Sequence, residues 1–251
     1  MSLDERFRSE KAKWDEISKR QAQEVEIFPS GMDFHEFARQ DAEFPGVSEF
    51  LGDLRGARVL ELGCGAGVMA VLLAKAGAHV TAFDLSSESV RLTRHRASLN
   101  HVELEPLVSA GEFLPFASES FDVIIGKSIL HHLVIEIGRR DLYRVLRKGG
   151  KAVFVEPLGM NPILTFARKY IPYPHKAVVG VDRPLTYDDM RAWNTEASEW
   201  QAQEIQFLSM LERAFGWDTR FEFLRKTDRF LLKNVPFLRR FCRYAVILSK
   251  K

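Results

Sequence analysis

The stretch Arg58-Val59-Leu60-Glu61-Leu62-Gly63-Cys64-Gly65-Ala66-Gly67 decides the fold of this chain. A short apolar run suited to a buried parallel strand leads directly into glycines at alternate positions, and residues 68–76 have the composition of a helix. Glycines there allow positive φ and let a ligand approach main-chain N–H groups, while the N-terminus of the following helix favours an anionic group. The pattern predicts a strand, a tight turn and a helix that together form a cradle for a nucleotide-like ligand.

Outward from this stretch, strands and helices are expected to alternate as a parallel sheet requires. The expected strands are 79–83, 104–108, 121–125 and 151–155, and the expected helices are 68–76, 87–99 and 136–147. This order predicts a doubly wound α/β fold with helices on both faces of the sheet. Ligands in such folds bind outside the carboxyl ends of the strands. The polar or strand-end positions expected at that edge are Glu61, Asp84, Ala110, Lys127 and Glu156.

The identity of the nucleotide depends on the third glycine of the turn. A dinucleotide fingerprint, G-x-G-x-x-G, would need glycine at position 68, where this chain has Val68. Asp84 follows Gly63 by 21 residues and is well placed to accept both hydroxyls of a ribose, or to cap the helix that starts after it. Because that spacing suits a dinucleotide equally, an NAD-type oxidoreductase remains an alternative, opposed by Val68.

Three groups of residues, including the glycine turn, carry a resemblance to a known family. Glu61, the G-x-G-x-G turn and Asp84 come first, Glu112-Phe113-Leu114-Pro115-Phe116 precedes Phe121-Asp122-Val123, and a run from Leu142 ends in Gly149-Gly150-Lys151. Together they resemble the class I S-adenosylmethionine-dependent methyltransferases of the small-molecule type, over roughly residues 57–157. The resemblance implies a seven-stranded, mostly parallel sheet with an antiparallel last strand, S-adenosyl-L-methionine as cofactor, and cofactor contacts from Glu61, Gly63, Cys64, Gly65, Gly67, Asp84, Leu85, Ala110, Gly111, Glu112 and Lys127.

The chain departs from the family at the adenine. Family members usually place an aspartate two residues before the acidic position of the Leu-Pro-Phe motif, and the matching residue here is Ala110. Adenine recognition is therefore expected from backbone groups near Ala110 and Gly111, from Glu112, or from apolar packing by Leu85. The same departure keeps open a third reading, a cofactor-binding scaffold without turnover.

The segment after the fourth expected strand bears on the acceptor. It reads Gly126-Lys127-Ser128-Ile129, which lacks the Asn/Asp-Pro-Pro-aromatic motif of enzymes that methylate exocyclic base nitrogens, so methyl transfer to an O or N atom of a small molecule is favoured. His132 is a candidate general base, because its ordinary pKa suits neutral pH, and His131 is a weaker one. Glu156 is a candidate acceptor-side carboxylate. Each of these side chains could instead pack or hydrogen-bond locally.

The remaining regions are assigned from composition and helical spacing. Residues 1–54 are expected to form a helical cap, either a solvated layer or a lid over the site, and residues 1–43 carry 7 Lys+Arg against 11 Asp+Glu. The core spans 55–157. An acceptor-side insertion is assigned to 158–215, with a helix capped by Thr186 and Asp189 and another over 198–215. Residues 216–251 are expected to supply the last two strands, at 217–224 and 243–249.

Charge and cysteine content bound the partners and the setting. The net charge of +2 predicts no general attraction to nucleic acid or membrane, although residues 225–251 hold nine Lys+Arg and one acid, Asp228, as either a solvated basic face or a surface for peripheral contact with phosphate or anionic lipid. Cys64 and Cys242 match no metal spacing, so no metal site is predicted. Unpaired cysteines and a polar N-terminus without a secretion signal favour the cytoplasm. The acceptor is expected to be hydrophobic or anionic, and no oligomeric state is predicted.

Overall fold

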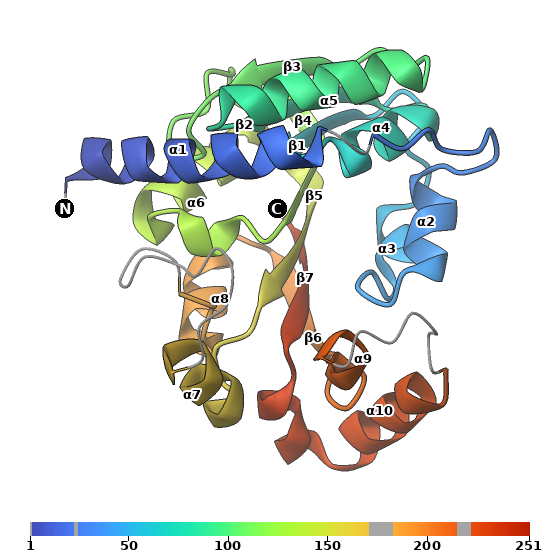
Figure 1. Ribbon diagram of the computed structural model, residues 1–251, viewed down its shortest axis with the longest axis vertical. Helices are drawn as coiled ribbons and strands as arrows, with labels where there is room; N and C mark the ends of the chain where they lie inside the picture. The colour runs from blue at the N-terminus through green and yellow to red at the C-terminus, as the bar shows by residue number, and fades with distance from the viewer. Residues whose placement is uncertain (1, 23–24, 171–182, 215–221) are drawn as a thin grey trace.

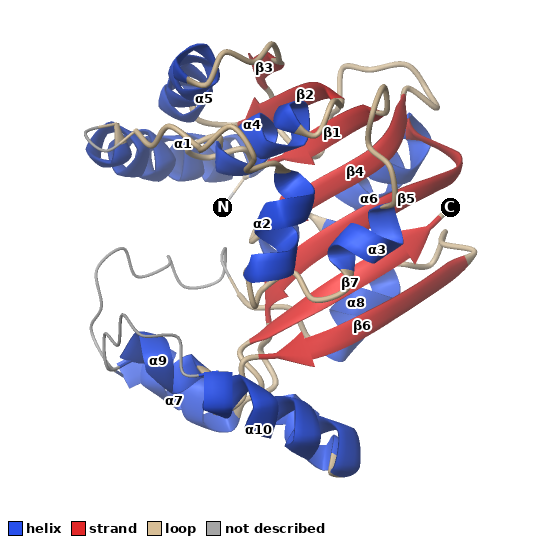
Figure 2. Cartoon of the chain, turned by 90° about the vertical axis from the view of Figure 1, so that its right-hand side faces the viewer, coloured by secondary structure: helices blue, strands red, loops and turns tan. Residues whose placement is uncertain are grey.

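A seven-stranded sheet forms the centre of the computed structural model, which describes residues 2–22, 25–170, 183–214 and 222–251. The strand order is β3-β2-β1-β4-β5-β7-β6 (Figure 2). The strands are β1 (Arg58–Leu62), β2 (His79–Asp84), β3 (Glu105–Val108), β4 (Phe121–Lys127), β5 (Leu146–Pro157), β6 (Glu199–Ile205) and β7 (Tyr244–Lys250). The first five run parallel, and β7 pairs antiparallel with both β5 and β6, which confirms the predicted fold class.

Helices cover both faces of this sheet (Figures 1 and 2). On one face, α2 (Phe34–Gln40), α3 (Val47–Leu51) and α4 (Val68–Lys75) share a core with the buried side chains of β1, β4, β5 and β7. On the other face, α6 (Ile135–Val145) and α8 (Tyr187–Trp193) share a second core with the alternate residues of the same strands. The buried strands are therefore apolar on both sides, as expected of a parallel sheet.

The remaining helices lie along the edges. Helix α1 (Leu3–Gln21) packs on α5 (Ser87–Leu99), whereas α7 (Pro162–Tyr170), α9 (Met210–Ala214) and α10 (Glu222–Asn234) lie at the lower end in Figures 1 and 2. Two short 3-10 helices, η1 (Leu130–His132) and η2 (Pro236–Phe241), complete the described elements. No described helix is both long and apolar enough to span a bilayer.

The strand register brings the predicted site residues to one edge of the sheet. Leu62 lies beside both Phe83 and Gly126, and Asp84 lies beside Val108 at the end of β3. Because parallel strands end at a common edge, the segments that follow β1, β2, β3 and β4 meet there, as predicted. We call this edge the rim.

Two expectations for the last third of the chain were wrong. Residues 199–205 form strand β6, not part of a helix over 198–215, and the described part of 217–224 begins helix α10. β6 is an edge strand whose residues are mostly polar and exposed, so it lacks the apolar run by which buried strands are recognised. The other predicted last strand, 243–249, is confirmed as β7, and so is the helix capped by Thr186 and Asp189.

Candidate active site

The glycine turn after β1 has the left-handed backbone that its sequence predicts. Gly63, Gly65 and Gly67 have φ of +66°, +51° and +77°. A Cβ on Gly63 would meet Ile129 at 2.9 Å and one on Gly67 would meet Thr93 at 2.7 Å, so both glycines are needed for internal packing. A Cβ on Gly65 would meet no atom within 4 Å. Gly65 is therefore the glycine of this turn that faces open space, where a ligand can approach the backbone.

Asp84 holds this turn in place. Its Oδ2 accepts a hydrogen bond from the Gly65 amide at 3.0 Å, and its Oδ1 accepts one from the Ser86 amide at 2.9 Å. Burial raises the pKa of Asp84, and the two backbone N–H donors oppose that shift. The predicted helix cap is supplied by Ser86, whose hydroxyl accepts from the Ser89 amide. Asp84 thus links the turn to the end of β2, the position predicted to contact a ribose.

Glu61 lies beneath the turn as a buried carboxyl. It is 1% exposed, and its Oε2 has no hydrogen-bond partner among the described residues. Burial, reinforced by the negative charge of Asp84, raises its pKa well above the usual range, and the Ala70 amide in the first turn of α4 opposes this. Burial, together with the negative charges of Glu61 and Asp84, also raises the pKa of the neighbouring Cys64 thiol. The buried Oε2 without a partner, at a ligand cradle, is suited to a cationic donor from the ligand.

The segment expected to contact adenine follows β3. Ala110 is half-buried, Gly111 is buried with its Cα facing Leu133, and Glu112 is 2% exposed. The Glu112 Oε1 accepts a hydrogen bond from the Val134 amide at 3.2 Å, and burial raises its pKa. Leu85, half-buried, follows β2. The structure thus brings all four predicted residues to the rim and gives Glu112 a partner in the loop after β4.

Helix α1 lies across these rim segments. The Asp15 carboxylate accepts from the Ser86 hydroxyl at 2.6 Å, and the Ser18 and Ser89 hydroxyls are hydrogen-bonded at 2.8 Å. Nearer its start, Arg6 lies 3.9 Å from the Glu112 carboxylate. No sequence pattern indicates these contacts, because the polar residues that make them resemble those of a solvated helix. Helix α1 therefore covers the segments that follow β2 and β3, and the domain boundary predicted at residue 54 stays a prediction.

The loop after β4 places two histidines beneath α1. The ring of His132 lies with Nδ1 3.2 Å from the Glu10 Oε2, although not at a hydrogen-bonding angle, and its edge meets Trp14 with ring centroids 5.7 Å apart. Glu10 also accepts from the Trp14 indole at 3.0 Å. Burial raises the pKa of Glu10, but His132, Lys13 and Trp14 together lower it further than burial raises it. His132 is thus a half-buried imidazole, with 9% of its side chain exposed, beside a carboxylate.

Glu156, at the end of β5, organises the same loop. Its Oε1 accepts from the Ile129 and Leu130 amides, both at 2.8 Å, and its Oε2 lies 2.7 Å from His131 Nδ1. It is 1% exposed. These contacts give Glu156 a positioning role for the histidine loop, and they occupy the carboxylate that was predicted to face the acceptor.

Lys127, at the end of β4, contacts residues that lie away from the glycine turn. Its ammonium forms an ion pair with Glu43, from the segment between α2 and α3, and lies 5.7 Å above the Phe44 ring. Glu43 also accepts from the Gln206 side chain at 2.9 Å, just after β6. The predicted cofactor residue Lys127 is therefore joined through Glu43 to the far end of the sheet.

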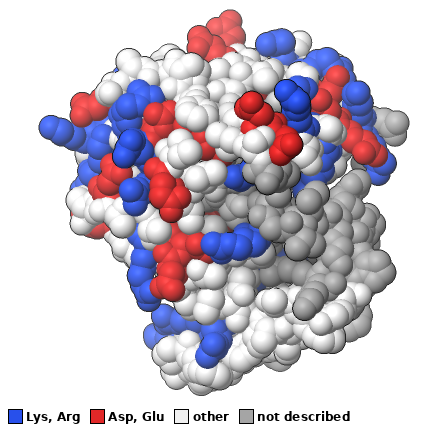
Figure 3. All heavy atoms as spheres, turned by 90° about the vertical axis from the view of Figure 1, so that its left-hand side faces the viewer, with Lys and Arg blue, Asp and Glu red and all other residues white. Residues whose placement is uncertain are grey.

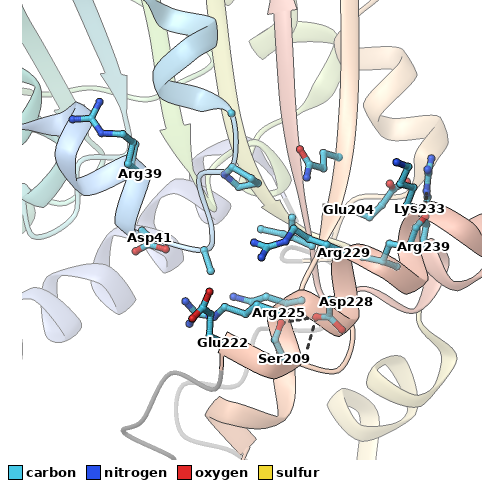
Figure 4. A pocket seen from close by; sticks show the side chains of 18 of the residues that line it. Arg39, Asp41, Glu204, Ser209, Glu222, Arg225, Asp228, Arg229, Lys233 and Arg239 are labelled. Carbon is cyan, nitrogen blue, oxygen red and sulfur yellow. Dashed lines mark hydrogen bonds between the residues drawn. The ribbon is translucent and has the colours of Figure 1, made fainter.

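Beyond that bridge lies a cavity of about 790 Å³ between the α2–α3 segment, the end of β6 and helix α10 (Figure 4). It lies away from the glycine turn, so it is not the cofactor cradle. Arg229 reaches into it from α10. The charged residues that line it are equal in number of each sign: Arg39, Arg225, Arg229, Lys233 and Arg239 against Asp41, Glu49, Glu204, Glu222 and Asp228. Its volume is that of a small-molecule site.

Comparison with known proteins identifies the family. Residues 60–154 match the family described as "Methyltransferase domain". Demethylmenaquinone methyltransferase of Corynebacterium urealyticum is 32% identical over 174 residues, which cover 65% of this chain and 68% of that protein. The chain belongs to the class I S-adenosylmethionine-dependent methyltransferases. The present chain is also 36% identical over 112 residues to a ubiquinone biosynthesis O-methyltransferase of Xanthomonas oryzae. The match covers 44% of the present chain and 46% of the Xanthomonas protein.

The fold comparison agrees. An S-adenosylmethionine-dependent methyltransferase from Methanosarcina mazei superposes with a TM-score of 0.58 and 20% identity, over 82% of this chain and 97% of the other. The chain spans about half the length of the ubiquinone biosynthesis O-methyltransferases that it matches. The family and the fold are thereby established, and the NAD-type alternative is set aside.

The residues present fit S-adenosylmethionine, the family's cofactor. The open face at Gly65 leaves room for a ligand against the backbone, and the unpartnered Glu61 carboxyl is suited to its cationic amino group. Asp84 stands at the position expected of a ribose ligand. Among the described residues no group of three acidic, histidine or cysteine side chains could hold a metal ion.

Proposed function

We propose that this protein transfers the methyl group of S-adenosylmethionine to an O or N atom of a small-molecule acceptor. The observation that carries the proposal is the turn at Gly65, open to solvent and held by Asp84 above the buried carboxyl of Glu61. The cofactor supplies a methyl group already activated on a sulfonium. The protein's tasks are then to align the acceptor, exclude water and remove a proton where the acceptor carries one.

We propose His132 as the group that removes the proton. Nδ1 lies 3.2 Å from the Glu10 carboxylate, and the other ring nitrogen is left to receive a proton from an acceptor at the rim. Glu10 would stabilise the imidazolium that forms, because a carboxylate beside a protonated histidine lowers its energy. Glu156 would act with His131 by fixing the loop that carries His132, a positioning role.

A hydrophobic acceptor is supported by two observations. The relatives named above are called ubiquinone biosynthesis and demethylmenaquinone methyltransferases, names that refer to quinones. In addition, helices α7 and α10 expose large apolar side chains near the part of the rim where β5 and β6 end, which we call the acceptor side of the rim. We also propose that the protein works in the cytoplasm, since Cys64 and Cys242 are free, buried thiols suited to a reducing compartment.

Turnover tests the proposal directly. The protein is incubated with S-adenosylmethionine and a panel of phenols, quinols and amines of graded hydrophobicity, and S-adenosylhomocysteine is measured. We expect acceptor-dependent product, fastest with a hydrophobic phenol or quinol. Binding of S-adenosylhomocysteine without turnover on any acceptor in the panel would favour the scaffold interpretation instead.

A further inference from the structure

The lower end of the molecule carries a concentration of exposed apolar side chains. Of thirteen large apolar residues that the described part of the chain exposes, seven lie on α7, α10 and the start of η2: Ile163, Phe166, Tyr170, Phe223, Phe230, Val235 and Phe237. Phe223 is 74% exposed and Phe230 66%. Single exposed apolar residues are ordinary, but a group of this size at one end of a molecule marks an interaction surface. We call these seven residues the apolar end.

The outward direction of these side chains is built into the fold. In α10, Phe223 and Phe230 are seven residues apart and therefore share one face. The opposite face is anchored by Asp228, which is buried and accepts hydrogen bonds from the amides of Phe207, Leu208 and Ser209. That anchor fixes the rotation of the helix and keeps both phenylalanines in solvent.

Helix α7 belongs to the same surface. The buried side chain of Asn161 caps the first turn of α7 by accepting from the Ile163 and Leu164 amides, and donates to the Phe241 carbonyl of η2 at 2.6 Å. Along α7 the exposed apolar side chains share the outer face, and the Phe166 and Tyr170 rings lie 4.6 Å apart. Figures 1 and 2 both place α7 and α10 at the lower end of the molecule.

The charges around the apolar end are mostly positive. Lys226, Arg229, Lys233, Arg239 and Arg240 are exposed on α10 and η2, and the exposed acid of these elements is Glu222, paired with Lys226 at 3.1 Å. Arg240 lies 5.5 Å from the Phe237 ring centroid. In Figure 3 the lower end is largely white, with Lys and Arg at its left side. Residues 225–251 were predicted as a possible surface for peripheral membrane contact. Residues 245–249 in β7 are buried in the sheet, so they cannot be part of that surface.

We propose that the apolar end docks on the surface of an anionic lipid bilayer, with Phe223, Phe230 and Phe237 inserted among the acyl chains and Lys226 and Lys233 at the headgroups. Phenylalanines flanked by cations on one face of a helix are the pattern of interfacial binding, and the excess of cations over acids on α10 and η2 favours an anionic surface over a neutral protein partner. The proposal rests on the proposed function in one respect: docking would bring the acceptor side of the rim close to a hydrophobic acceptor held in the bilayer.

Vesicle sedimentation tests the docking. The protein is mixed with phosphatidylcholine vesicles, with and without phosphatidylglycerol, and the bound fraction is measured. We expect binding to the anionic vesicles that weakens with salt. Phe223→Ser with Phe230→Ser should lower the partition coefficient by about tenfold for each phenylalanine. Lys226→Glu with Lys233→Glu should lower it about a hundredfold.

Matched controls separate docking from misfolding and from the proposed function. Ile27→Ser and Lys148→Glu remove an exposed apolar side chain and an exposed cation elsewhere, and they should leave vesicle binding unchanged. S-adenosylhomocysteine affinity, measured on every variant, should not move. Equal binding to neutral and anionic vesicles, no binding to either, or a self-association that the phenylalanine variants abolish while vesicle binding persists, would each overturn the proposal. Absence of S-adenosylhomocysteine binding in the unaltered protein would instead overturn the proposed function.

Discussion

The two halves of the rim are built in different ways. Where β1, β2, β3 and β4 end, the site consists of backbone turns fastened by buried carboxyls, such as Asp84 on the Gly65 amide and Glu112 on the Val134 amide, with α1 across them. Where β5 and β6 end and β7 begins, the rim is bordered by α7 and α10, which expose aromatic side chains, with exposed cations on α10. We expect the first half to bind one fixed ligand, and the second to supply side chains to the proposed acceptor and membrane surface.

Glu43 links these halves. It pairs with Lys127 at the end of β4 and accepts from Gln206 after β6. Burial raises the pKa of Glu43, but Lys127 and Gln206, with a smaller contribution from Arg243, lower it further than burial raises it. The carboxylate is thus charged where the two regions meet. If the division is correct, changes in the first half should alter cofactor affinity, and changes in the second should alter only acceptor or membrane behaviour.

The largest effect is expected from Gly65→Val. A valine there fills the open face of the turn, so we expect no detectable binding of S-adenosylhomocysteine by calorimetry. Gly149→Val is the matched control, because Gly149 also has positive φ, +71°, and open space around its Cα, but lies in the turn within β5. Both variants carry the left-handed strain of about 1–2 kcal/mol. If both bind normally, the cradle is misplaced.

His132→Ala should come next. General base catalysis is typically worth about 10² to 10⁴ in rate, so turnover should fall by that factor while S-adenosylhomocysteine affinity stays within a few-fold. Glu10→Gln should lower turnover less, because it removes only the charge that stabilises the imidazolium. Turnover of the His132 variant within a few-fold of the original would show that the imidazole is structural and that alignment alone sustains the reaction.

Asp84→Ala should weaken cofactor binding by about 1.5–3 kcal/mol, the range for hydrogen bonds to a charged group. Calorimetric titration measures the change. The Glu43→Gln variant provides the contrast, since it should raise the Michaelis constant for the acceptor and leave cofactor affinity unchanged. Equal losses of cofactor affinity in both variants would contradict a division at Glu43.

A smaller effect, on stability, should follow from Glu61. Its pKa is raised in the folded protein, so the native state holds a proton that the unfolded state has lost, and stability should fall as pH rises from about 4.3, the ordinary pKa of glutamate, through the raised value. Over that interval the contribution of Glu61 to the free energy of unfolding should fall by about 1.4 kcal/mol for each pH unit. Asp84 and Glu112, whose pKa values are also raised, add to this slope, so Glu61→Gln should lower the slope in urea unfolding followed with pH by the contribution of Glu61, and should weaken cofactor binding. An unchanged slope would show that Glu61 is charged or paired in the free protein.

The sequence predicted the first half of the rim well, because its elements are encoded locally. The apolar runs before Gly63 and Asp84 mark buried strands, and the glycines mark a turn that only they can form at low cost. The histidine loop was located, but the partners of its side chains were not. Glu10 and Trp14 lie more than a hundred residues from His132 in the chain, and nothing in a polar N-terminal helix indicates which of its residues will be buried.

The second half was predicted less well for a related reason. Trp200 and Ala202 lie in an edge strand that is mostly polar, and the neighbouring Phe207 and Leu211 completed a spacing typical of a helix. Pairing with β7 decided the conformation of residues 199–205, and its partners are distant in the chain, since residue 205 pairs with 244 and residue 199 with 250. Residues 171–182 of the predicted acceptor-side insertion lie outside the described residues, and the division at 158–215 and 216–251 stays a prediction.

One calorimetric titration tests the central claim most directly, namely that the turn at Gly65 with Asp84 and Glu61 is an S-adenosylmethionine site. The protein is titrated separately with S-adenosylhomocysteine and with NAD⁺, in the unaltered form and as the Phe223→Ser, Phe230→Ser double variant. We predict one S-adenosylhomocysteine bound per chain, with the same affinity in both proteins, and no heat from NAD⁺. Binding of NAD⁺ in place of S-adenosylhomocysteine, or of neither, would contradict the account.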